Sequence, residues 1–572
     1  MRYLIFRICI YLGLAFLLGG LFHTQVIQGQ YYMELGDKNR MRLIPVEAPR
    51  GRVFDRNGNL LATNRPAYDI VATPEDVTPD VIKTLSAMLT LSNEEIKKRL
   101  RSPREYPFAP AVISEDISQE LAFKIEEMRP DLAGVEIRVS GLRFYPYGET
   151  AAHIIGFIGK INKQEYLDHE EKGRYGFNSM IGRAGLEKLY DEELRGWRGG
   201  RQIEVNAQGK LVRVLSEKNP DPGKDLIVTV DLEFQKRIME LLKDHHASVA
   251  VLDIKTSELI AMASTPSFDP NVFVAPGLES KRLSFIKDKE APMLDRGISS
   301  SYPPGSIFKL VTALAALETG KITPGTHFFC SGQFRLKPGT SPRKCWYAQG
   351  HGNLNLYEAI ERSCNVYFYN LGKLLTADEI AHYARELGLG KEMEIETTNI
   401  SPGLVPDSAW KKSHFKEKWY QGETLSFAIG QSYLLTSPLQ ILRLVATIAS
   451  GGRSIEPRLL RDPSIPPDTS RVAITKAHIE IVKKGMLQVV QSDYGTGQLA
   501  RLDFGTMAAK TGTAQAPPLN SHAWMTGFFP YEDPEIAFVV FVEHGGSGGI
   551  AAAGIVKGTF EIWKEMYGPK VA

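Results

Sequence analysis

The sequence predicts an α+β protein in which one membrane-spanning helix leads into an elongated N-terminal region and a larger domain with an antiparallel sheet flanked by helices. Three observations support this prediction. A long apolar segment without charges lies near the N-terminus, a cluster of turn-forming residues divides the remaining chain near residue 222, and strand-like segments lie at both ends of the second part. The chain has 572 residues, 43% of them hydrophobic and 23% charged, which excludes a disordered, collagen-like or coiled-coil protein.

The balance of charges gives no sign of a nucleic-acid partner. Lysine and arginine total 68, aspartate and glutamate total 66, and no basic stripe stands out from this even mixture. We therefore expect no nucleic-acid binding. The four cysteines are too few for a disulfide scaffold in a chain of this length.

The N-terminal segment is expected to anchor the protein in a membrane. The stretch from Ile8 to Ile27 contains no Asp, Glu, Lys or Arg and is long enough to cross a bilayer as one helix. Arg2 and Arg7 precede it, so the positive-inside rule keeps the N-terminus cytoplasmic and exports the chain after about residue 28. A cleaved signal peptide is the alternative, but it requires small residues where residues 21–27 are mostly bulky. We expect residues 1–28 to form a single uncleaved anchor.

Residues 29–222 are rich in short turns and charged helical segments. Asn57-Gly58 predicts a hairpin between residues 52–54 and 60–62, and Ser92 with Glu95 has the spacing of a capping box. No nucleophile, base and orienting group gather in this region, so a spacer or docking module is expected. The breaker cluster at residues 219–223 marks its end.

Residues 223–572 alternate between strand and helix patterns. We expect strands at residues 225–230, 248–253, 259–263, 506–511, 523–529 and 536–542, and helices at residues 232–243 and 554–567. Strands at both ends of a mostly helical middle predict an antiparallel sheet assembled from distant segments.

The first chemical motif in this region is Ser306-Ile307-Phe308-Lys309. Pro303-Pro304-Gly305 breaks the chain just before it and an apolar helix follows, which places Ser306 at a helix N-terminus and Lys309 one turn later on the same face. A lysine half-buried among apolar groups can lose its proton near neutral pH and serve as base for the hydroxyl. An ordinary capping serine beside a solvated lysine is the alternative, because the same spacing occurs at Ser284, Ser341, Ser408 and Ser413.

Two further short motifs follow along the chain. Ser363-Cys364-Asn365 lies between two helical patterns, and Lys510-Thr511-Gly512-Thr513 lies on an expected strand. Strand alternation puts Lys510 and Gly512 on one face and the two threonines on the other, and the glycine allows a ligand close to the backbone. Taken singly, the first is a polar break and the second an ordinary strand end.

In the order Ser-x-x-Lys, Ser-x-Asn, Lys-Thr-Gly, the three motifs resemble those of the penicillin-interacting serine acyltransferases. The resemblance covers nearly the whole chain, because further segments are similar to landmarks of class B penicillin-binding proteins. These segments are residues 49–58 (PRGRVFDRNG), 144–148 (FYPYG), 185–190 (GLEKLY), 268–271 (FDPN), 428–431 (AIGQ) and 436–440 (TSPLQ). The chain is identified as a member of that class, similar to its elongation transpeptidases. The N-terminal region is too short for the second catalytic domain of class A proteins.

The resemblance implies a fold and a reaction. A penicillin-binding transpeptidase domain over residues 223–572 would follow a pedestal or dimerisation-type domain over residues 29–222. Ser306 would attack the D-Ala–D-Ala bond of a peptidoglycan stem peptide, with Lys309 taking its proton and the backbone N–H groups of Ser306 and Thr513 forming the oxyanion hole. An amine of a neighbouring stem would then take the acyl group and complete the cross-link. β-Lactams would acylate the same serine and leave slowly.

The remaining motif residues receive supporting roles from the same resemblance. Ser363 and Lys510 would relay a proton to the leaving amine, and Asn365 would hold the donor amide. The terminal carboxylate of the substrate would be received by Lys510, Thr511 and Thr513, with Gly512 between them.

Three cysteines and a histidine predict a structural zinc site. Cys330, Cys345, His351 and Cys364 supply three thiolates and an imidazole, a set that suits tetrahedral Zn²⁺. Some elongation transpeptidases carry a zinc site in this segment, with carboxylates where this chain has cysteines. A metal here would anchor the loop carrying Ser363. The alternative is a disulfide between Cys330 and Cys345, which an exported domain permits.

The resemblance also implies partners and a location. The protein would lie in the bacterial inner membrane as a single-pass protein with an extracytoplasmic catalytic domain, and its N-terminal region would contact a RodA-like membrane glycosyltransferase of the SEDS type. Two other functions stay open on the residues alone. A membrane-bound β-lactam sensor or β-lactamase would share the serine and both lysines, and a non-catalytic scaffold would keep the motifs without using them.

Overall fold

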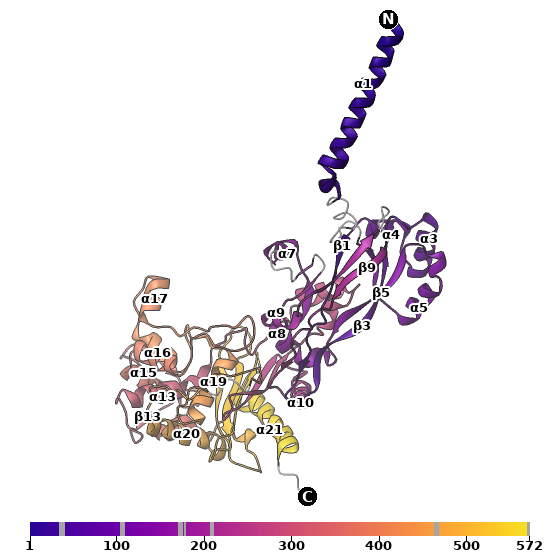
Figure 1. Cartoon of the computed structure of the whole chain (residues 1–572). Helices are drawn as coiled ribbons and strands as arrows, with labels where there is room; N and C mark the ends of the chain where they lie inside the picture. Colours follow the sequence, from indigo (N-terminus) through magenta and orange to yellow (C-terminus); the bar gives the residue numbers. More distant parts are fainter. Residues whose placement is uncertain are drawn as a thin grey trace.

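The protein is an elongated molecule with a long helix extending from one end (Figure 1). The structure, a computed structural model, describes residues 1–33, 41–102, 109–169, 175–176, 179–205, 211–462 and 468–568. Helix α1 (Arg2–Phe22) continues into a π-helical turn, His23–Ile27, and none of its residues is buried. Together they form one apolar helix of 26 residues, whose most apolar 18-residue stretch has a mean hydropathy of 2.2, and it is long enough to span a membrane.

The described N-terminal region contains three sheets, the smallest of which pairs β6 (Ile158–Lys160) with β7 (Met180–Gly182). The first has the strand order β1-β8-β9, and the second has the order β10-β2-β3-β4 with β5 also paired to β3. The strands are β1 (Met41–Val46), β2 (Val53–Phe54), β3 (Leu60–Ala72), β4 (Ala111–Ile117), β5 (Val135–Phe144), β8 (Gly199–Val205), β9 (Leu211–Lys218) and β10 (Leu226–Ile227). The predicted hairpin is confirmed, because β2 pairs antiparallel with β3 across Asn57-Gly58. The expected strand at residues 225–230 is reduced to the two residues of β10, which pair parallel with β2.

Three helices cover one end of the second sheet: α3 (Pro79–Leu89), α4 (Asn93–Leu100) and α5 (Gln119–Glu127). Half of the predicted capping box forms: the Ser92 side chain accepts a hydrogen bond from the backbone N–H of Glu95, whereas the Glu95 carboxylate pairs with Arg99 at 3.1 Å. A small apolar core that includes Ile70, Leu85 and Ile113 lies beneath these helices.

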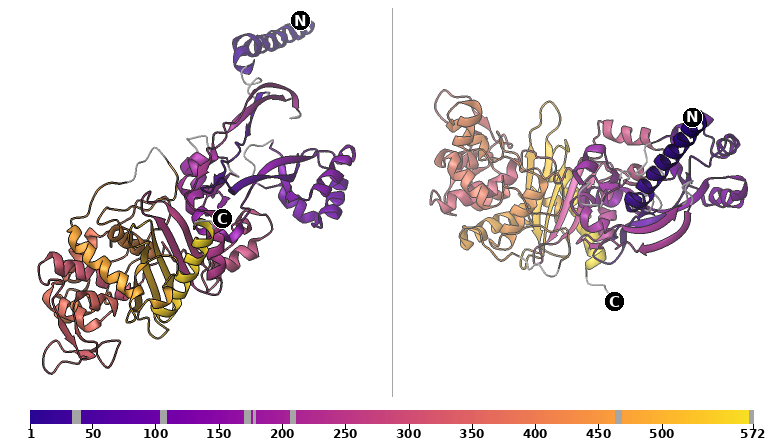
Figure 2. Two further views of the ribbon diagram at one scale, coloured as in Figure 1. Left: turned by 90° about the horizontal axis from the view of Figure 1, so that it is seen from below. Right: turned by 45° about the horizontal axis from the view of Figure 1, so that its top comes forward.

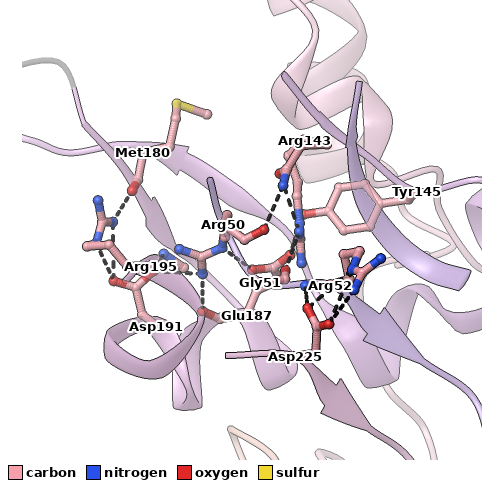
Figure 3. A network of polar contacts seen from close by, with 12 residues as sticks. Arg50, Gly51, Arg52, Arg143, Tyr145, Met180, Glu187, Asp191, Arg195 and Asp225 are labelled. Carbon is pink, nitrogen blue, oxygen red and sulfur yellow. Dashed lines mark hydrogen bonds and ion pairs between the residues drawn. The ribbon is translucent and has the colours of Figure 1, made fainter. Parts of the chain in front are cut away.

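A buried network of charges joins the distant segments of this region (Figure 3). Glu187, in helix α8 (Gly185–Leu189), accepts Arg143 Nε at 2.6 Å and Arg50 Nε at 2.7 Å, and Arg50 also reaches Asp191 at 2.8 Å. Burial opposes ionisation of Glu187, but the two guanidinium groups outweigh this effect and lower its pKa. Arg143 also donates to the carbonyl of Gly51 at 2.7 Å. Strand β5, helix α8 and the chain before β2 are thereby held together.

A second polar cluster connects the N-terminal region to the C-terminal domain. Asp55 accepts a hydrogen bond from the backbone N–H of Leu232 at 3.1 Å, at the start of helix α10 (Leu232–Leu242). Asp231, the capping residue of that helix, accepts Asn57 Nδ2 at 2.9 Å and the hydroxyl of Tyr567 at 2.7 Å. The Asp55–Asn57 turn therefore contacts the start of α10, and Asp231 connects it to Tyr567 near the C-terminus.

The C-terminal domain is built on the predicted antiparallel sheet. Its strand order is β12-β11-β19-β18-β17, which places segments from the start and the end of the domain side by side. The strands are β11 (Ala247–Asp253), β12 (Leu259–Thr265), β17 (Ala508–Ala514), β18 (His522–Phe529) and β19 (Ile536–Val542). All five segments were expected as strands, and β17, which carries Lys510, lies at the edge.

Helices pack on both faces of this sheet. Side chains such as Val249 and Val540 share an apolar core with α10 and the predicted C-terminal helix α21 (Ala553–Tyr567). The alternating residues, such as Ala250 and Val539, pack on the other side with α13 (Lys309–Glu318), α19 (Pro438–Ala449) and α20 (Lys476–Gln491). Most of the chain between β12 and β17 forms a helical lobe beside the sheet (Figure 2).

Candidate active site

Ser306 lies in a short turn between the sheet and the helical lobe. The turn is a 3₁₀-helix, Gly305–Phe308, which runs directly into α13. Gly305 has φ +56°, and a Cβ at this position would lie 2.8 Å from the carbonyl oxygen of Thr513, so only glycine fits. This close approach places Ser306 beside strand β17. Within the described part of the chain the Ser306 hydroxyl makes no hydrogen bond, which leaves it free for a substrate.

Lys309 is fully buried and directed at the second motif. Its Nζ lies 2.7 Å from the carbonyl oxygen of Ser363, 2.7 Å from Asn365 Oδ1 and 3.2 Å from Ser363 Oγ. The sequence predicted a half-buried lysine; the side chain is deeper because α13 lies inside the helical lobe with nine of its ten residues buried. Burial lowers the pKa of Lys309 to about 8, although the nearby Cys364 and Cys345 act in the opposite direction.

Ser363 lies between two lysines. Its hydroxyl is 3.2 Å from Lys309 Nζ and 3.0 Å from Lys510 Nζ. The residue has φ +51°, a conformation that a non-glycine residue rarely adopts and that is frequent at functional sites. Lys510 is fully buried, and both this burial and the charge of Lys309 lower its pKa well below the usual value. Two buried ammonium groups this close to one hydroxyl favour the loss of a proton from the pair.

Strand β17 presents its two threonines differently. The Thr511 hydroxyl is buried and lies 2.6 Å from the hydroxyl of Thr496, in the loop before the strand. Thr513 is exposed, and its hydroxyl accepts a hydrogen bond from the backbone N–H of Gly548 at 3.3 Å. Gly512 lies against the carbonyl oxygen of Pro304, where a Cβ would approach to 2.9 Å. Thr513 is therefore the threonine of this segment that faces outward.

The three cysteines and the histidine come together as the sequence predicted. The ligand atoms of Cys330, Cys345, His351 and Cys364 all lie within 4.8 Å of one another. His351 Nδ1 is 3.6 Å from the sulfur atoms of both Cys330 and Cys345. The N···S edge of a tetrahedral zinc site, with its usual bond lengths, is about 3.6 Å. All three cysteines are free thiols in this structure, so the predicted alternative of a Cys330–Cys345 disulfide is not formed.

The electrostatics of this cluster also suit a metal. A hydrogen bond from the Cys364 thiol lowers the pKa of Cys345, which favours the thiolate form that binds a metal. Cys364 lies between Ser363 and Asn365, and both of these residues contact Lys309. The cysteine–histidine cluster is therefore joined directly to the Ser363-Cys364-Asn365 motif through Cys364.

Comparison with known families agrees with this geometry. Residues 247–561 match the family model described as "Penicillin binding protein transpeptidase domain", and residues 45–228 match "Penicillin-binding Protein dimerisation domain". This chain belongs to the class B penicillin-binding proteins. The predicted transpeptidase fold with an N-terminal domain and one apolar helix is thereby confirmed.

Individual class B penicillin-binding proteins are similar over most of their length. The Peptidoglycan D,D-transpeptidase MrdA of Haemophilus influenzae is 32% identical, over 98% of this chain and 92% of its own. A structure of PBP2 in complex with MreC, from Helicobacter pylori, has a TM-score of 0.84 at 28% identity and covers 92% of this chain and 100% of that one. A structure described as "Structural coordination of polymerization and crosslinking by a peptidoglycan synthase complex" has a TM-score of 0.75 at 29% identity and covers 99% of both chains.

The structure of this penicillin-binding protein gathers the residues that the sequence selected. Contacts between side chains connect Lys309, Ser363, Asn365 and Lys510, and the Gly305 turn brings Ser306 to Thr513. Thr496 was missed, because a lone threonine in a loop carries no signal until the fold places it against Thr511.

Proposed function

We propose that this protein is an elongation-type peptidoglycan D,D-transpeptidase that works through an acyl-enzyme at Ser306. The observation that carries the proposal is the convergence of two buried lysines on the Ser363 hydroxyl, at 3.2 Å and 3.0 Å, beside the turn that holds Ser306. Both lysines have lowered pKa values, as proton transfer near neutral pH requires.

Acylation begins when Ser306 Oγ attacks the carbonyl carbon of the penultimate D-Ala. Lys309 receives the hydroxyl proton. In its neutral form the amine donates to the Ser363 carbonyl and to Asn365 Oδ1 and keeps a lone pair for that proton. The negative oxygen of the tetrahedral intermediate lies between the backbone N–H groups of Ser306 and Thr513, which the Gly305 turn brings together.

Collapse of the intermediate breaks the bond to the terminal D-Ala. The leaving amine takes a proton through the Ser363 hydroxyl, which Lys510 replenishes, and Asn365 holds the amide of the donor. The terminal carboxylate is received at the outer end of β17 by Lys510, Thr511 and Thr513, and Gly512 lets the strand pack closely against Pro304 in the segment that carries Ser306. The amine of a second stem then attacks the ester at Ser306, forms the cross-link and frees the serine. With water as the acceptor, the same acyl-enzyme gives carboxypeptidation.

Covalent labelling with a fluorescent penicillin tests this proposal. We expect wild-type protein to carry a label that is stable for many minutes, and Ser306→Ala to carry none while keeping the wild-type melting temperature. Ser413→Ala is the matched control, because Ser413 has the same Ser-x-x-Lys spacing outside the site, and it should label normally. Rapid loss of the label would indicate a β-lactamase, and no label on folded wild-type protein would indicate a scaffold.

The cysteine–histidine cluster is proposed to hold a structural Zn²⁺. Cys330, Cys345, His351 and Cys364 would bind it, and the metal would fix the Ser363–Asn365 turn against the helical lobe rather than take part in acyl transfer. The support is the 3.6 Å spacing of His351 Nδ1 from two sulfur atoms. Elemental analysis of protein purified without chelator should give about one zinc per chain. Cys345→Ser should lose it, whereas Cys9→Ser in the apolar helix should not; a metal-free wild-type protein would contradict the site.

The location and partners extend the same proposal. Helix α1 anchors the protein in the bacterial inner membrane, with residues 1–28 as the anchor segment, residues 29–222 as a pedestal and residues 223–572 as the extracytoplasmic catalytic domain. A RodA-like SEDS glycosyltransferase is the proposed partner of the pedestal. It would supply glycan strands to be cross-linked, and the similarity to a chain of a peptidoglycan synthase complex supports this. Co-purification of the two proteins from membranes tests the contact.

A further inference from the structure

An exposed group of aromatic residues and one arginine lies beside the second motif. Trp346 is 57% exposed and Tyr494 is 69% exposed. Trp346 Nε1 donates to the carbonyl oxygen of Arg362 at 3.0 Å. The Arg362 guanidinium lies over the Tyr494 ring, 4.4 Å from its centroid. We call Trp346, Arg362 and Tyr494 the arginine rim.

Each member of the arginine rim comes from a segment that also contacts the active site. Arg362 directly precedes Ser363. Tyr494 lies two residues before Thr496, whose hydroxyl is 2.6 Å from that of Thr511. The backbone carbonyl of Lys344, two residues before Trp346, accepts a hydrogen bond from Asn365 Nδ2 at 3.5 Å.

The loop that carries Tyr494 is held at this place by further contacts. The Ser492 hydroxyl donates to the Glu361 carboxylate, and the Thr496 backbone N–H donates to the Glu361 carbonyl at 3.4 Å. The arginine rim is therefore a fixed border of the site.

Arg362 differs from the two lysines of the motifs in that its charged group is not engaged by protein oxygens among the described residues. Lys309 and Lys510 are fully buried, and their Nζ atoms contact protein oxygens. The Arg362 guanidinium forms no ion pair or hydrogen bond with any residue in the described ranges, and its Nε is buried without a partner. A half-buried guanidinium held in position without a counter-charge is suited to receive an anion from a ligand.

We propose that Arg362, stacked on Tyr494, binds a carboxylate of the stem peptides that react at Ser306. This inference rests on the proposed function. Stem peptides offer two carboxylates on this side of the scissile bond: that of the terminal D-Ala in the donor, which Arg362 would share with Lys510 and the threonines of β17, and that beside the attacking amine in the acceptor. Both place an anion next to the Lys-Thr-Gly strand, to which the Tyr494 loop is joined through Thr496 and Thr511.

Two kinetic comparisons on full-length Arg362→Gln test the proposal and distinguish the two carboxylates. The first compares acylation by a fluorescent penicillin with acylation by its methyl ester, which lacks the charge. The second compares incorporation of a D-amino acid with that of its amide into a stem-peptide donor. We expect wild-type protein to favour the charged partner in at least one comparison. For that charged partner alone, the rate of the variant should be about 10- to 100-fold lower than that of wild-type protein. The affected comparison identifies the donor or the acceptor carboxylate.

Control variants separate charge recognition from structure. Arg362→Lys should recover part of the discrimination, because it keeps the charge but not the planar fork. Lys418→Gln, which removes a lysine lying 5.7 Å from the Tyr420 ring, should match wild type in both comparisons. All variants should keep the wild-type melting temperature and metal content. Rates within about twofold of wild type in both comparisons, or equal losses on charged and neutral partners, would overturn the proposal. Failure of wild-type protein to react at Ser306 would instead contradict the proposed function.

Discussion

The buried amine of Lys309 determines how the reaction depends on pH. This amine has a pKa of about 8 and acts as a base only when neutral, so acylation should accelerate as the pH rises through this value. Well below it, the acylation rate constant should fall about tenfold for each pH unit. Because Lys309 and Lys510 share the Ser363 hydroxyl, the measured value belongs to the coupled pair.

A pH profile of penicillin acylation, with melting temperatures recorded at each pH, measures this dependence. The two buried amines both have lowered pKa values, so the midpoint should lie well below 10.5, the ordinary value for lysine. A midpoint near 10.5 would show that Lys309 is not the base.

Gly305 controls the geometry of the oxyanion hole. Its φ of +56° and the 2.8 Å that a Cβ would leave to the Thr513 carbonyl mean that Gly305→Ala must move either Ser306 or strand β17. Loss of one oxyanion donor costs about 10²- to 10³-fold in comparable sites, and we expect a decrease of that size in the acylation rate constant. Gly339→Ala, at an exposed glycine with φ +82° and open space around a Cβ, is the control. An unchanged rate in Gly305→Ala would place the oxyanion elsewhere.

The sequence could identify the reacting residues but not how deeply they lie or what lies beside them. The order and flanks of the three motifs selected Ser306, Lys309 and Lys510 because each motif follows a local rule. Burial of Lys309 and the pairing of Thr511 with Thr496 depend on segments that meet only in the folded chain. Arg362 gave no signal for the same reason, since Tyr494 lies far away in the sequence.

At the scale of elements, the buried charge network is the strongest restraint on the N-terminal region. The side chains of Arg143 and Glu187 are 1% and 0% exposed. Removing one partner of a buried ion pair leaves an uncompensated charge, so Arg143→Met should lower the free energy of unfolding by about 3–5 kcal/mol. Arg129→Met removes an arginine that is 56% exposed and paired with Glu126, and should change it by less than about 1 kcal/mol. Chemical denaturation of both variants measures the difference, and equal effects would contradict it.

Local sequence patterns predicted most strands and helices but could not predict which distant segments contact each other. Short, mostly apolar runs predicted all five strands of the catalytic sheet, because helices cover both of its faces and nearly every residue of these strands is buried. Residues 225–230 form a similar apolar run but give only the short β10, since Val228 pairs in an isolated bridge with Leu460. The network around Glu187 could not be predicted, because its charged residues come from segments far apart in the chain.

For the whole molecule, the anchor and the catalytic domain should be separable functions. Helix α1 makes no buried contact with the rest of the protein. Deleting residues 1–28 should therefore release the protein from membranes while leaving its rate of penicillin labelling within about twofold of wild type. Membrane fractionation followed by fluorescent labelling measures both properties. A truncated protein that stays in the membrane, or that is soluble and folded but fails to label, would contradict the separation.

The strand order of the catalytic sheet also has a consequence for biosynthesis. Strand β11, near residue 250, pairs with β19, near residue 540, so the central strands of the sheet meet only after almost the whole chain has been made. Until β19 has been secreted, the hairpin of β11 and β12 has an unpaired edge, and such an edge is prone to aggregation. Pairing between strands so far apart in the sequence is also slow. A premature stop codon before β19 should therefore yield no β-lactam-reactive protein, even though such a product contains all three motifs. Quality control of the nascent chain, and not only catalysis, depends on the segment that begins with β19.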